Sequence, residues 1–408
     1  MDGFLRDKRD RMASTAAQCR DDLVNHVAPY WADRVIDREH GGFHTCFAKD
    51  GTLYDARHPG WFMGRTMYMF SALYHEFDRN PRWLDVARAG YQSMPLYQLP
   101  DGRFAQMLTA DGRVENGAIS IFTDHFAVKG LINYLAALGH DAPKAEIDRA
   151  RQMLDKLLED VQKPDVLRTV CADERFMTHA VTFMNIAVLL ESTKLFGDAY
   201  SSVLQENVFR SMYAFASDEW NAPLEHVGYD GHPIAEGPGR LVDAGHTMES
   251  VWFAMEAAQL LGLPQLTQRA SQVLDWVIDR CWDSEYGGFV QHVDAFEPVP
   301  EEPYLYTDYN GVPVGWQDKI WWVQAEGLIA LLSSALHTHN PAHWQLFETL
   351  YDYVRARFVD PQTREWYSFL HRDGSMLFDA PGSMSKGPYH VPRCLMMLCT
   401  LLEKALQA

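Results

Sequence analysis

Apolar residues recur with helical spacing along most of the chain. Met67, Phe70 and Tyr74 fall on one face of a helix, and Leu190 and Leu195 belong to a similar stripe. Clean alternation of apolar and polar residues, which would indicate half-buried strands, is scarce. The pattern therefore predicts a chain built mainly from helices.

The predicted helices are of two interleaved kinds. One kind is amphipathic and rich in charge, and it covers about 16–31, 82–93, 145–160, 200–215, 265–281 and 342–358. The other kind is apolar nearly all round and carries polar or aromatic residues at its start, near Trp61, Thr123, Thr178, His246, Trp321 and His390. A helix that is apolar on every face is a buried helix, so we expect the second kind to be inner and the first kind to be outer.

The inner helices begin about every 55 to 75 residues, a spacing too irregular for a solenoid repeat. Six outer–inner hairpins that close in a ring form an (α/α)6 barrel. We therefore predict an all-α fold, an (α/α)6 barrel of six helical hairpins, as a single catalytic domain over residues 1–408. Short β-hairpins are expected in its loops, for example at 42–48 and 288–293, which follow Gly-Gly pairs.

Composition narrows the class of protein. The chain has 408 residues, of which 47% are hydrophobic, so it can bury a full core and is not disordered. Its net charge of −19 argues against a nucleic-acid partner and against an anionic membrane surface. Neither a signal peptide nor an apolar run long enough to span a bilayer is visible. The six cysteines form no CxxC pair, so free thiols in a reducing cytoplasm are expected.

Candidate chemistry gathers at the starts of the inner helices. His246 and Glu249 are separated by one helical turn, so they share a face, and a carboxylate beside an imidazole can orient it and raise its pKa. Trp61 and Arg65 are also one turn apart. An aromatic ring beside a guanidinium suits a sugar, whose ring stacks and whose hydroxyls accept hydrogen bonds.

An ordered set of segments carries a family resemblance. It consists of HGGFHTCFAKDG at 40–51, WFMGRTMYMF at 61–70, GRLVDAGHTMESVWF at 239–253, 321–332 and YHVPRCLMM at 389–397. The set resembles the N-acylglucosamine 2-epimerase family, which includes mannose isomerases, sulfoquinovose isomerases and cellobiose 2-epimerases. The resemblance covers nearly the whole chain and implies an (α/α)6 barrel, in agreement with the hairpin pattern.

The resemblance also implies a reaction. By carry-over, His246 and His390 flank C2 of an open-chain sugar; one removes the C2 proton to give a cis-enediolate, and the other returns a proton to the opposite face. Arg65 polarises the carbonyl oxygen, and Glu249 and Glu326 set the orientation and charge of the histidines. The chemistry requires neither a metal nor a cofactor, so none is expected.

The remaining predicted site residues bind the sugar. Those expected to wall the pocket or contact the substrate are Trp61, His179, Arg240, Trp321, Gln324, Glu326 and Tyr389. His179 matches the isomerases and cellobiose epimerases, whereas the following Ala180-Val181 pair resembles the acyl-sugar epimerases. The substrate therefore stays open between N-acetylglucosamine/N-acetylmannosamine and a mannose-type hexose. The role of His125 is open too, and the resemblance suggests a homodimer.

Three alternatives remain beside the 2-epimerase. An aldose–ketose isomerase of the mannose-to-fructose type would use the same residues and return the proton to C1. A glycoside hydrolase on the same barrel would pair carboxylates such as Glu249, Glu326 or Asp124. A non-catalytic binding module would bind a sugar or a protein and form no product. The first interpretation is preferred because the matched polar positions are histidines within larger motifs.

Overall fold

The computed structural model describes residues 3–297, 306–308 and 311–407, and it is mainly helical. The chain forms two compact units. The first unit comprises Met1–Ala28, Gln205–Pro381 and His390–Ala408, and the second comprises Pro29–Leu204 and Gly382–Tyr389. A single domain over residues 1–408 stays a prediction, and each unit is described by itself.

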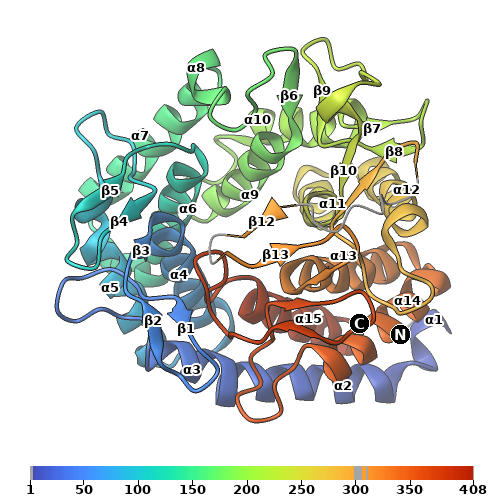
Figure 1. The fold of residues 1–408 in the computed structure, drawn as a ribbon, viewed down its shortest axis with the longest axis horizontal. Helices are drawn as coiled ribbons and strands as arrows, with labels where there is room; N and C mark the ends of the chain where they lie inside the picture. The colour runs from blue at the N-terminus through green and yellow to red at the C-terminus, as the bar shows by residue number, and fades with distance from the viewer. Residues whose placement is uncertain (1–2, 298–305, 309–310, 408) are drawn as a thin grey trace. The chain divides into compact units, whose positions relative to one another are not determined.

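Three inner helices form the core of the first unit (Figure 1). They are α11 (Ala244–Leu261), α13 (Trp321–Thr338) and α15 (His390–Gln407), and α13 packs against both of the others. Their outer partners are α12 (Pro264–Cys281) on α11, α14 (Pro341–Arg357) on α13 and α2 (Arg9–Asp21) on α15. The first long helix of the chain thus covers the last one.

The second unit has the same plan. Its inner helices are α4 (Gly60–Ala72), α6 (Phe122–Leu138) and α9 (His179–Phe196), and α6 packs against both α4 and α9. Outer helix α5 (Pro81–Tyr97) covers α4, and α7 (Lys144–Asp160) covers α6. Nearly every residue of α6 is buried, as its apolar sequence requires.

The inner helices begin within two residues of their predicted starts. Asp243 caps the inner helix α11 with its side-chain oxygen, and Asn80 and Asn340 cap the outer helices α5 and α14 in the same way. Proline opens α5, α12 and α14, where its missing N–H has no intrahelical partner to lose.

Two predicted outer helices are interrupted. The segment predicted at 16–31 consists of α2, a π-helical turn η1 (Asp22–Val27) and α3 (Ala28–Ala32). The segment at 200–215 consists of α10 (Ser201–Phe209) and a π-helical turn η4 (Arg210–Ala214). Periodicity misses such a turn because one inserted residue shifts the stripe without ending it. The remaining short helical segments are α1 (Gly3–Arg6), η2 (Leu73–Phe77), η3 (Gly139–Asp141), α8 (Pro164–Leu167) and η5 (Gly237–Arg240).

The strands are short. Those in the second unit are β1 (Cys46–Phe47), β2 (Leu53–Asp55), β3 (His58–Pro59), β4 (Met107–Leu108), β5 (Val114–Asn116) and β6 (Phe176–Thr178). Those in the first unit are β7 (Ala216–Ser217), β8 (Ala222–Pro223), β9 (His226–Gly228), β10 (Leu241–Asp243), β11 (His292–Asp294), β12 (Tyr306–Thr307), β13 (Pro313–Val314), β14 (Lys319–Ile320), β15 (Phe369–Leu370) and β16 (Met376–Phe378). Antiparallel ladders join β1 to β2, β4 to both β3 and β5, β7 to β8, β10 to β11, β12 to β13, and β15 to both β14 and β16.

Several strands lead directly into inner helices. β3 ends where α4 begins, β10 ends where α11 begins, and β14 ends where α13 begins. In the β10–β11 ladder, Val242 lies opposite Val293 and Asp243 opposite His292. The ladders therefore fix the starts of the helices that carry the predicted site residues.

One turn recurs after three of the outer helical segments, and we call it the Asp turn. Asp37, Asp283 and Asp360 each follow an isolated β-bridge residue and donate their backbone N–H to a carbonyl five residues later. One side-chain oxygen of each aspartate accepts the backbone N–H groups two and three residues on. The other carboxylate oxygen faces the side chains that lie beside the turn, and these side chains differ among the turns.

Two further expectations can be compared with the structure. The six cysteines are free thiols, as predicted. Within the described residues, every helix is too short or too polar to cross a lipid bilayer.

The crossing of α4 and α6 yields a stability prediction. A Cβ atom added at Gly64 would lie 2.2 Å from the backbone carbonyl of Phe126, so the helices could not keep their separation. We expect Gly64→Ala to lower the free energy of unfolding by about 3 kcal/mol, measured by chemical denaturation. Gly117→Ala is the control, because a Cβ there would be 4.0 Å from its nearest neighbour, Leu99. Equal effects of the two substitutions would contradict the prediction.

Candidate active site

His246 lies in the first turn of α11, directly after β10. Asp243 caps this helix: its Oδ1 accepts the backbone N–H of His246 at 2.9 Å. The imidazole Nδ1 lies 3.0 Å from Oε2 of Glu225 and 3.6 Å from Oδ2 of Asp243. Both carboxylates are buried, whereas the imidazole is 28% exposed. The two carboxylates therefore hold the imidazole through its Nδ1 atom.

The surroundings of His246 favour its charged form. Asp243 is also bonded to His292, whose Nε2 lies 2.7 Å from Oδ2, and to the amide of Gln291. Burial opposes protonation of His246, but the negative charges of Asp243 and Glu225 outweigh it and raise the pKa of His246 to about 10. Near neutral pH this histidine is therefore an imidazolium.

His390 is the first residue of α15, and its surroundings differ. Its Nδ1 lies 2.8 Å from Oε1 of Glu326, an entirely buried carboxylate on α13. The same oxygen accepts a hydrogen bond from the Arg393 guanidinium at 2.7 Å. The indole N–H of Trp252 donates to the other oxygen of Glu326 at 2.9 Å. The expected contact between Glu326 and a histidine is thus present.

Arg393 joins two carboxylates. Its Nη2 donates to Glu249 at 2.6 Å as well as to Glu326, and its guanidinium lies over the ring of Trp252. The side chain is fully buried. Glu249 thus bonds Arg393, and its negative charge also acts to raise the pKa of His246. The carboxylates that lie at the His246 ring are those of Glu225 and Asp243. A catalytic role for Glu249 stays a prediction.

Trp322 lies between the two histidines. Its ring centroid is 5.6 Å from that of His246 and 5.5 Å from that of His390, with interplanar angles of 41° and 40°. The close approach depends on Gly245, where a Cβ would lie 2.2 Å from the indole. The glycine of the GHTME segment is thus required by packing, next to the histidine that is predicted to be catalytic.

Three predicted binding residues of the first unit have other partners. Trp321, the expected pocket wall, is buried against Phe369; its neighbour Trp322 contacts the histidines. Gln324 bonds the backbone N–H and carbonyl of Phe289 and so ties α13 to the Asp turn after α12. These contacts give both side chains a structural role, and their predicted contact with substrate stays a prediction.

Arg240 is the third. It pairs with Asp294 at 2.8 Å and with Glu297 at 2.8 Å. Arg240 thus joins the end of η5 to β11 and to the residues after it, and its predicted place in the sugar site stays a prediction. Sequence proximity to His246 was the only signal for it, and the ladder directs the side chain to the neighbouring strand.

The second unit contains the predicted Trp61–Arg65 pair. The Arg65 guanidinium lies over several aromatic rings, 4.2 Å from the centroid of Phe126, 4.8 Å from that of Tyr389 and 5.1 Å from that of Trp61. The predicted adjacency of Trp61 and Arg65 is confirmed. Tyr389 is buried, and its hydroxyl accepts a hydrogen bond from Lys129.

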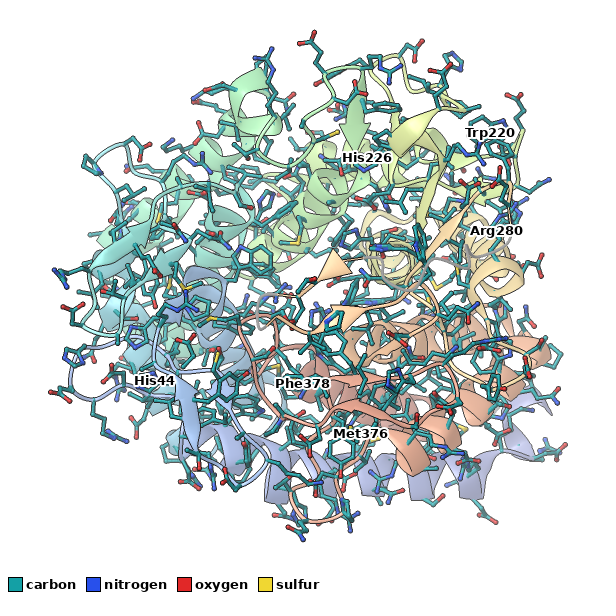
Figure 2. All side chains as sticks on the ribbon, viewed as in Figure 1. His44, Trp220, His226, Arg280, Met376 and Phe378 are labelled. Atoms are coloured by element: carbon teal, nitrogen blue, oxygen red, sulfur yellow. The ribbon has the colours of Figure 1, made fainter. Side chains whose placement is uncertain are left out.

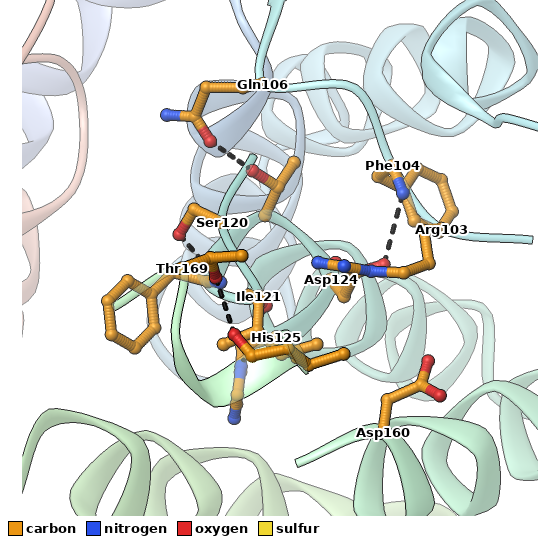
Figure 3. A network of polar contacts seen from close by, with 12 residues as sticks. Arg103, Phe104, Gln106, Ser120, Ile121, Asp124, His125, Asp160 and Thr169 are labelled. Atoms are coloured by element: carbon orange, nitrogen blue, oxygen red, sulfur yellow. Dashed lines mark hydrogen bonds and ion pairs between the residues drawn. The ribbon is translucent and has the colours of Figure 1, made fainter. Parts of the chain in front are cut away.

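His125 and Asp124 belong to a structural network of the second unit (Figure 3). His125 is buried. Its Nδ1 lies 3.0 Å from the carbonyl oxygen of Ile121, and its Nε2 lies 2.9 Å from the amide oxygen of Asn185. Asp124 bonds Arg103 and the backbone N–H of Phe104. Both residues therefore hold the start of α6.

His179 is the first residue of α9. It is buried, and its ring packs edge-on against Phe183 with centroids 5.6 Å apart. Its predicted contact with substrate stays a prediction.

Sequence reasoning missed four residues of the histidine network: Glu225, Trp322, Arg393 and His292. Arg393 stands in the HVPRC segment and Trp322 beside a predicted residue, so both were visible in the motifs. Glu225 and His292 reach His246 or its cap from distant parts of the chain, and nothing in their local sequence indicates that.

Comparison with known proteins agrees with this geometry. A model of the family described as N-acylglucosamine 2-epimerase (GlcNAc 2-epimerase) matches residues 41–394. The chain is 29% identical to N-acylglucosamine 2-epimerase of Mus musculus over 396 residues, which cover 94% of this chain and 91% of the mouse protein.

Solved structures show the fold. Cellobiose 2-epimerase of Spirochaeta thermophila DSM 6192 superposes with a TM-score of 0.78 at 18% identity, covering 98% of this chain and 100% of that one. A D-mannose isomerase superposes with a TM-score of 0.75 at 17% identity, covering 95% and 97%. The predicted all-α fold of the (α/α)6 class is confirmed.

The match over most of the chain decides its family: this protein belongs to the N-acylglucosamine 2-epimerase family. It is accordingly an enzyme of the isomerase class, a carbohydrate epimerase.

The charge on His246 yields a pH prediction. Its pKa is raised from 6.5 to about 10 on folding, so the stabilisation from its positive charge is complete below about pH 6.5. That stabilisation is lost as the pH rises through about 10. We expect an NMR titration to show the His246 imidazole protonated up to that range, and Glu225→Gln to lower its pKa. A wild-type pKa near 6.5 would contradict the prediction.

The buried position of Arg393 yields a second prediction. Arg393→Met would leave the carboxylates of Glu249 and Glu326 buried without their cation, and we expect a loss of about 3–5 kcal/mol in the free energy of unfolding. Adding Glu249→Gln should recover part of the loss. The control is Arg210→Met, which breaks the half-exposed pair with Glu206 and should cost less than about 1 kcal/mol. A loss as small as that of the control would refute the buried-cation role.

Proposed function

We propose that this enzyme epimerises N-acylhexosamines at C2, interconverting N-acetylglucosamine and N-acetylmannosamine, with His246 and His390 as the proton-transfer pair. The observation that carries the proposal is that two histidines both lie beside Trp322, each with a carboxylate at its Nδ1. A two-base epimerisation needs two such groups, since one base must remove the proton and the other must deliver one to the opposite face.

The two histidines differ in charge environment, which supports different starting states. The negative charges of Asp243 and Glu225 raise the pKa of His246 to about 10, so it holds a proton near neutral pH. At His390 the charge of Glu326 is shared with Arg393. We therefore assign His246 as the resting acid and His390 as the resting base.

With these roles, every proton in the reaction has a donor and an acceptor. His390 Nε2 takes the C2 proton of one epimer as the open-chain 2-acylamino aldehyde becomes an enolate with its negative charge on the C1 oxygen, and His246 Nε2 gives its proton to the other face of C2 as the aldehyde re-forms. The product is the second epimer, with the proton now on His390. Reverse turnover begins from that state, and exchange with solvent restores the resting one.

The carboxylate at each Nδ1 also fixes the orientation of the imidazole ring. A ring bonded through Nδ1 keeps one orientation and directs Nε2 toward its substrate, as in other histidine–carboxylate pairs. Arg393 holds Glu326 in place and is bonded to Glu249 as well, so we assign Glu249 and Arg393 as positioning residues for His390. A hydrolase that used Glu249 and Glu326 as acid and base would need to separate both from this guanidinium.

The proposed substrate class rests on the relatives. The mouse protein named N-acylglucosamine 2-epimerase is 29% identical to this chain, against 22% for a cellobiose 2-epimerase of Bacteroides fragilis. The acyl-sugar assignment is therefore preferred over a mannose-type hexose. We retain Arg65 as the proposed group that polarises the sugar carbonyl oxygen, because its aromatic neighbours hold the planar guanidinium in one orientation. A cytoplasmic homodimer is part of the proposal, and the free thiols are consistent with a reducing compartment.

Solvent exchange tests the mechanism. Incubation of the enzyme with N-acetylglucosamine or N-acetylmannosamine in D2O should interconvert them and place deuterium at C2, as followed by proton NMR. His246→Asn and His390→Asn should each lower interconversion by roughly 10²- to 10⁴-fold. Each single variant should still exchange the C2 proton of one epimer, and the two variants should act on opposite epimers.

The control is His232→Asn, an exposed histidine of the first unit, which should leave both exchange and interconversion unchanged. Turnover without solvent deuterium, or turnover insensitive to His390→Asn, would refute the mechanism. Conversion of mannose to a ketose labelled at C1, with no reaction of the acyl sugars, would replace the epimerase assignment by the aldose–ketose isomerase.

A further inference from the structure

Three potential metal ligands of the second unit meet beside the first Asp turn. They are Asp37 in the turn, His44 on the loop that leads into β1, which Figure 2 labels, and His58 at the start of β3. One ligand atom from each lies within 4.8 Å of the others. Oδ2 of Asp37 is 3.1 Å from Nε2 of His58 and 3.6 Å from Nε2 of His44.

The Nδ1 atoms of both histidines in this cluster are buried and unsatisfied. His58 is 0% exposed; its Nε2 faces Asp37, whereas its Nδ1 has no hydrogen-bond partner in the structure. Nδ1 of His44 has none either, and the two rings lie 4.9 Å apart. Buried polar atoms are normally paired, so a nitrogen pair of this kind calls for an explanation.

The Asp turn after α12 provides an internal comparison. There, the outward oxygen of Asp283 bonds Lys319 at 2.9 Å and Arg372 at 2.8 Å, so the buried carboxylate is neutralised by cations. Lys319 opens β14, the strand that leads into α13. His58 opens β3, the strand that leads into α4, and therefore stands in the same place. An imidazole therefore lies beside Asp37 at the position where a lysine lies beside Asp283.

The charge state of the cluster fits metal ligation. Burial lowers the pKa of His58 to about 4 and also lowers the pKa of His44, so both rings are neutral near pH 7. Burial acts to raise the pKa of Asp37, but backbone N–H groups of His40 and Glu39 outweigh it, and the carboxyl stays ionised. Two neutral imidazoles beside a carboxylate leave one buried negative charge.

We propose that Asp37, His44 and His58 bind one divalent transition metal ion of the Zn²⁺ type. Imidazole nitrogen and carboxylate oxygen are ligands that such an ion prefers. With metal–ligand bonds of about 2.0–2.1 Å, the ligand atoms of a tetrahedral site lie roughly 3.3 Å apart. The observed separations of 3.1 and 3.6 Å bracket that value. The ion supplies the positive charge that Lys319 supplies at Asp283.

A fourth ligand position lies toward solvent. Nδ1 of His40, whose side chain is 36% exposed, is 3.4 Å from Oδ2 of Asp37 and can complete the set, or water can take that position. None of these residues belongs to the unit that carries His246 and His390. The expectation that the reaction needs no metal is therefore untouched, and the ion would act structurally, by fastening the loop 37–58 to the start of α4.

Cobalt substitution tests the proposal directly. The full-length protein is treated with a chelator and then titrated with Co²⁺ near neutral pH. We expect one equivalent to bind with the visible d–d bands of a four-coordinate cobalt ion, and Zn²⁺ to displace it. Zn²⁺ should also raise the Tm of the chelator-treated protein.

His58→Lys is the informative variant, because it rebuilds the lysine–aspartate pair seen at Lys319 and Asp283 and so should fold. It should abolish the cobalt spectrum and the rise of Tm with Zn²⁺. His44→Gln is a second variant that removes one ligand only, and it should weaken cobalt binding at least tenfold. The control is His140→Gln, an exposed histidine that lies 3.3 Å from Asp141; it should bind cobalt as the wild type does.

Three results would overturn the proposal. The first is the absence of stoichiometric cobalt binding. The second is binding that survives His58→Lys but disappears with His292→Gln, which would assign the ion to the Asp243 cluster of the first unit. The third is an NMR titration in which His58 carries a proton at neutral pH without metal, since the compensating cation would then be the proton.

Discussion

The candidate active site depends on one buried guanidinium. Arg393 bonds Glu249 of α11 and Glu326 of α13 from its own place on α15, so a single side chain joins the three inner helices of the first unit. Its charge makes it possible to bury two carboxylates, and one of these carboxylates fixes His390. The inner helices therefore cannot shift relative to one another without disturbing the ring that we assign as a base.

The second histidine is built on a different principle. His246 is fixed by Asp243, which serves at once as helix cap, as partner of His292 and as a source of negative charge. The two imidazoles thus lie in different charge environments: the ring of His246 lies beside two carboxylates, whereas Glu326 at the ring of His390 shares its charge with Arg393. Differences of this kind are how a protein assigns acid and base roles near neutral pH.

Much of the fold was predictable because inner and outer helices differ in a property that sequence shows directly, namely how much of the helix surface is apolar. The inner starts at Trp61 and His390 were placed to within a residue for that reason. Turns of π-helix after α2 and α10 were not, because they leave the apolar stripe nearly intact.

Site residues could likewise be predicted only where the signal lies in the local sequence. His246, His390 and Glu326 could be found because they stand in local motifs on helices. Glu225 could not, because its contact with His246 arises only when a loop folds back over β10. The partners of Arg240 and Gln324 could not be predicted for the complementary reason: proximity in sequence does not tell which strand or backbone a long polar side chain will meet.

The place of Trp322 has a consequence for how the enzyme can be observed. Its indole is in van der Waals range of both imidazoles, and Gly245 ensures that nothing intervenes on the His246 side. A charge that appears on either ring alters the electric field across the indole, most strongly when the cation faces the π system. The absorption and emission of this one tryptophan therefore record which of its two neighbours holds the proton, so the protein carries an optical reporter of its own protonation state.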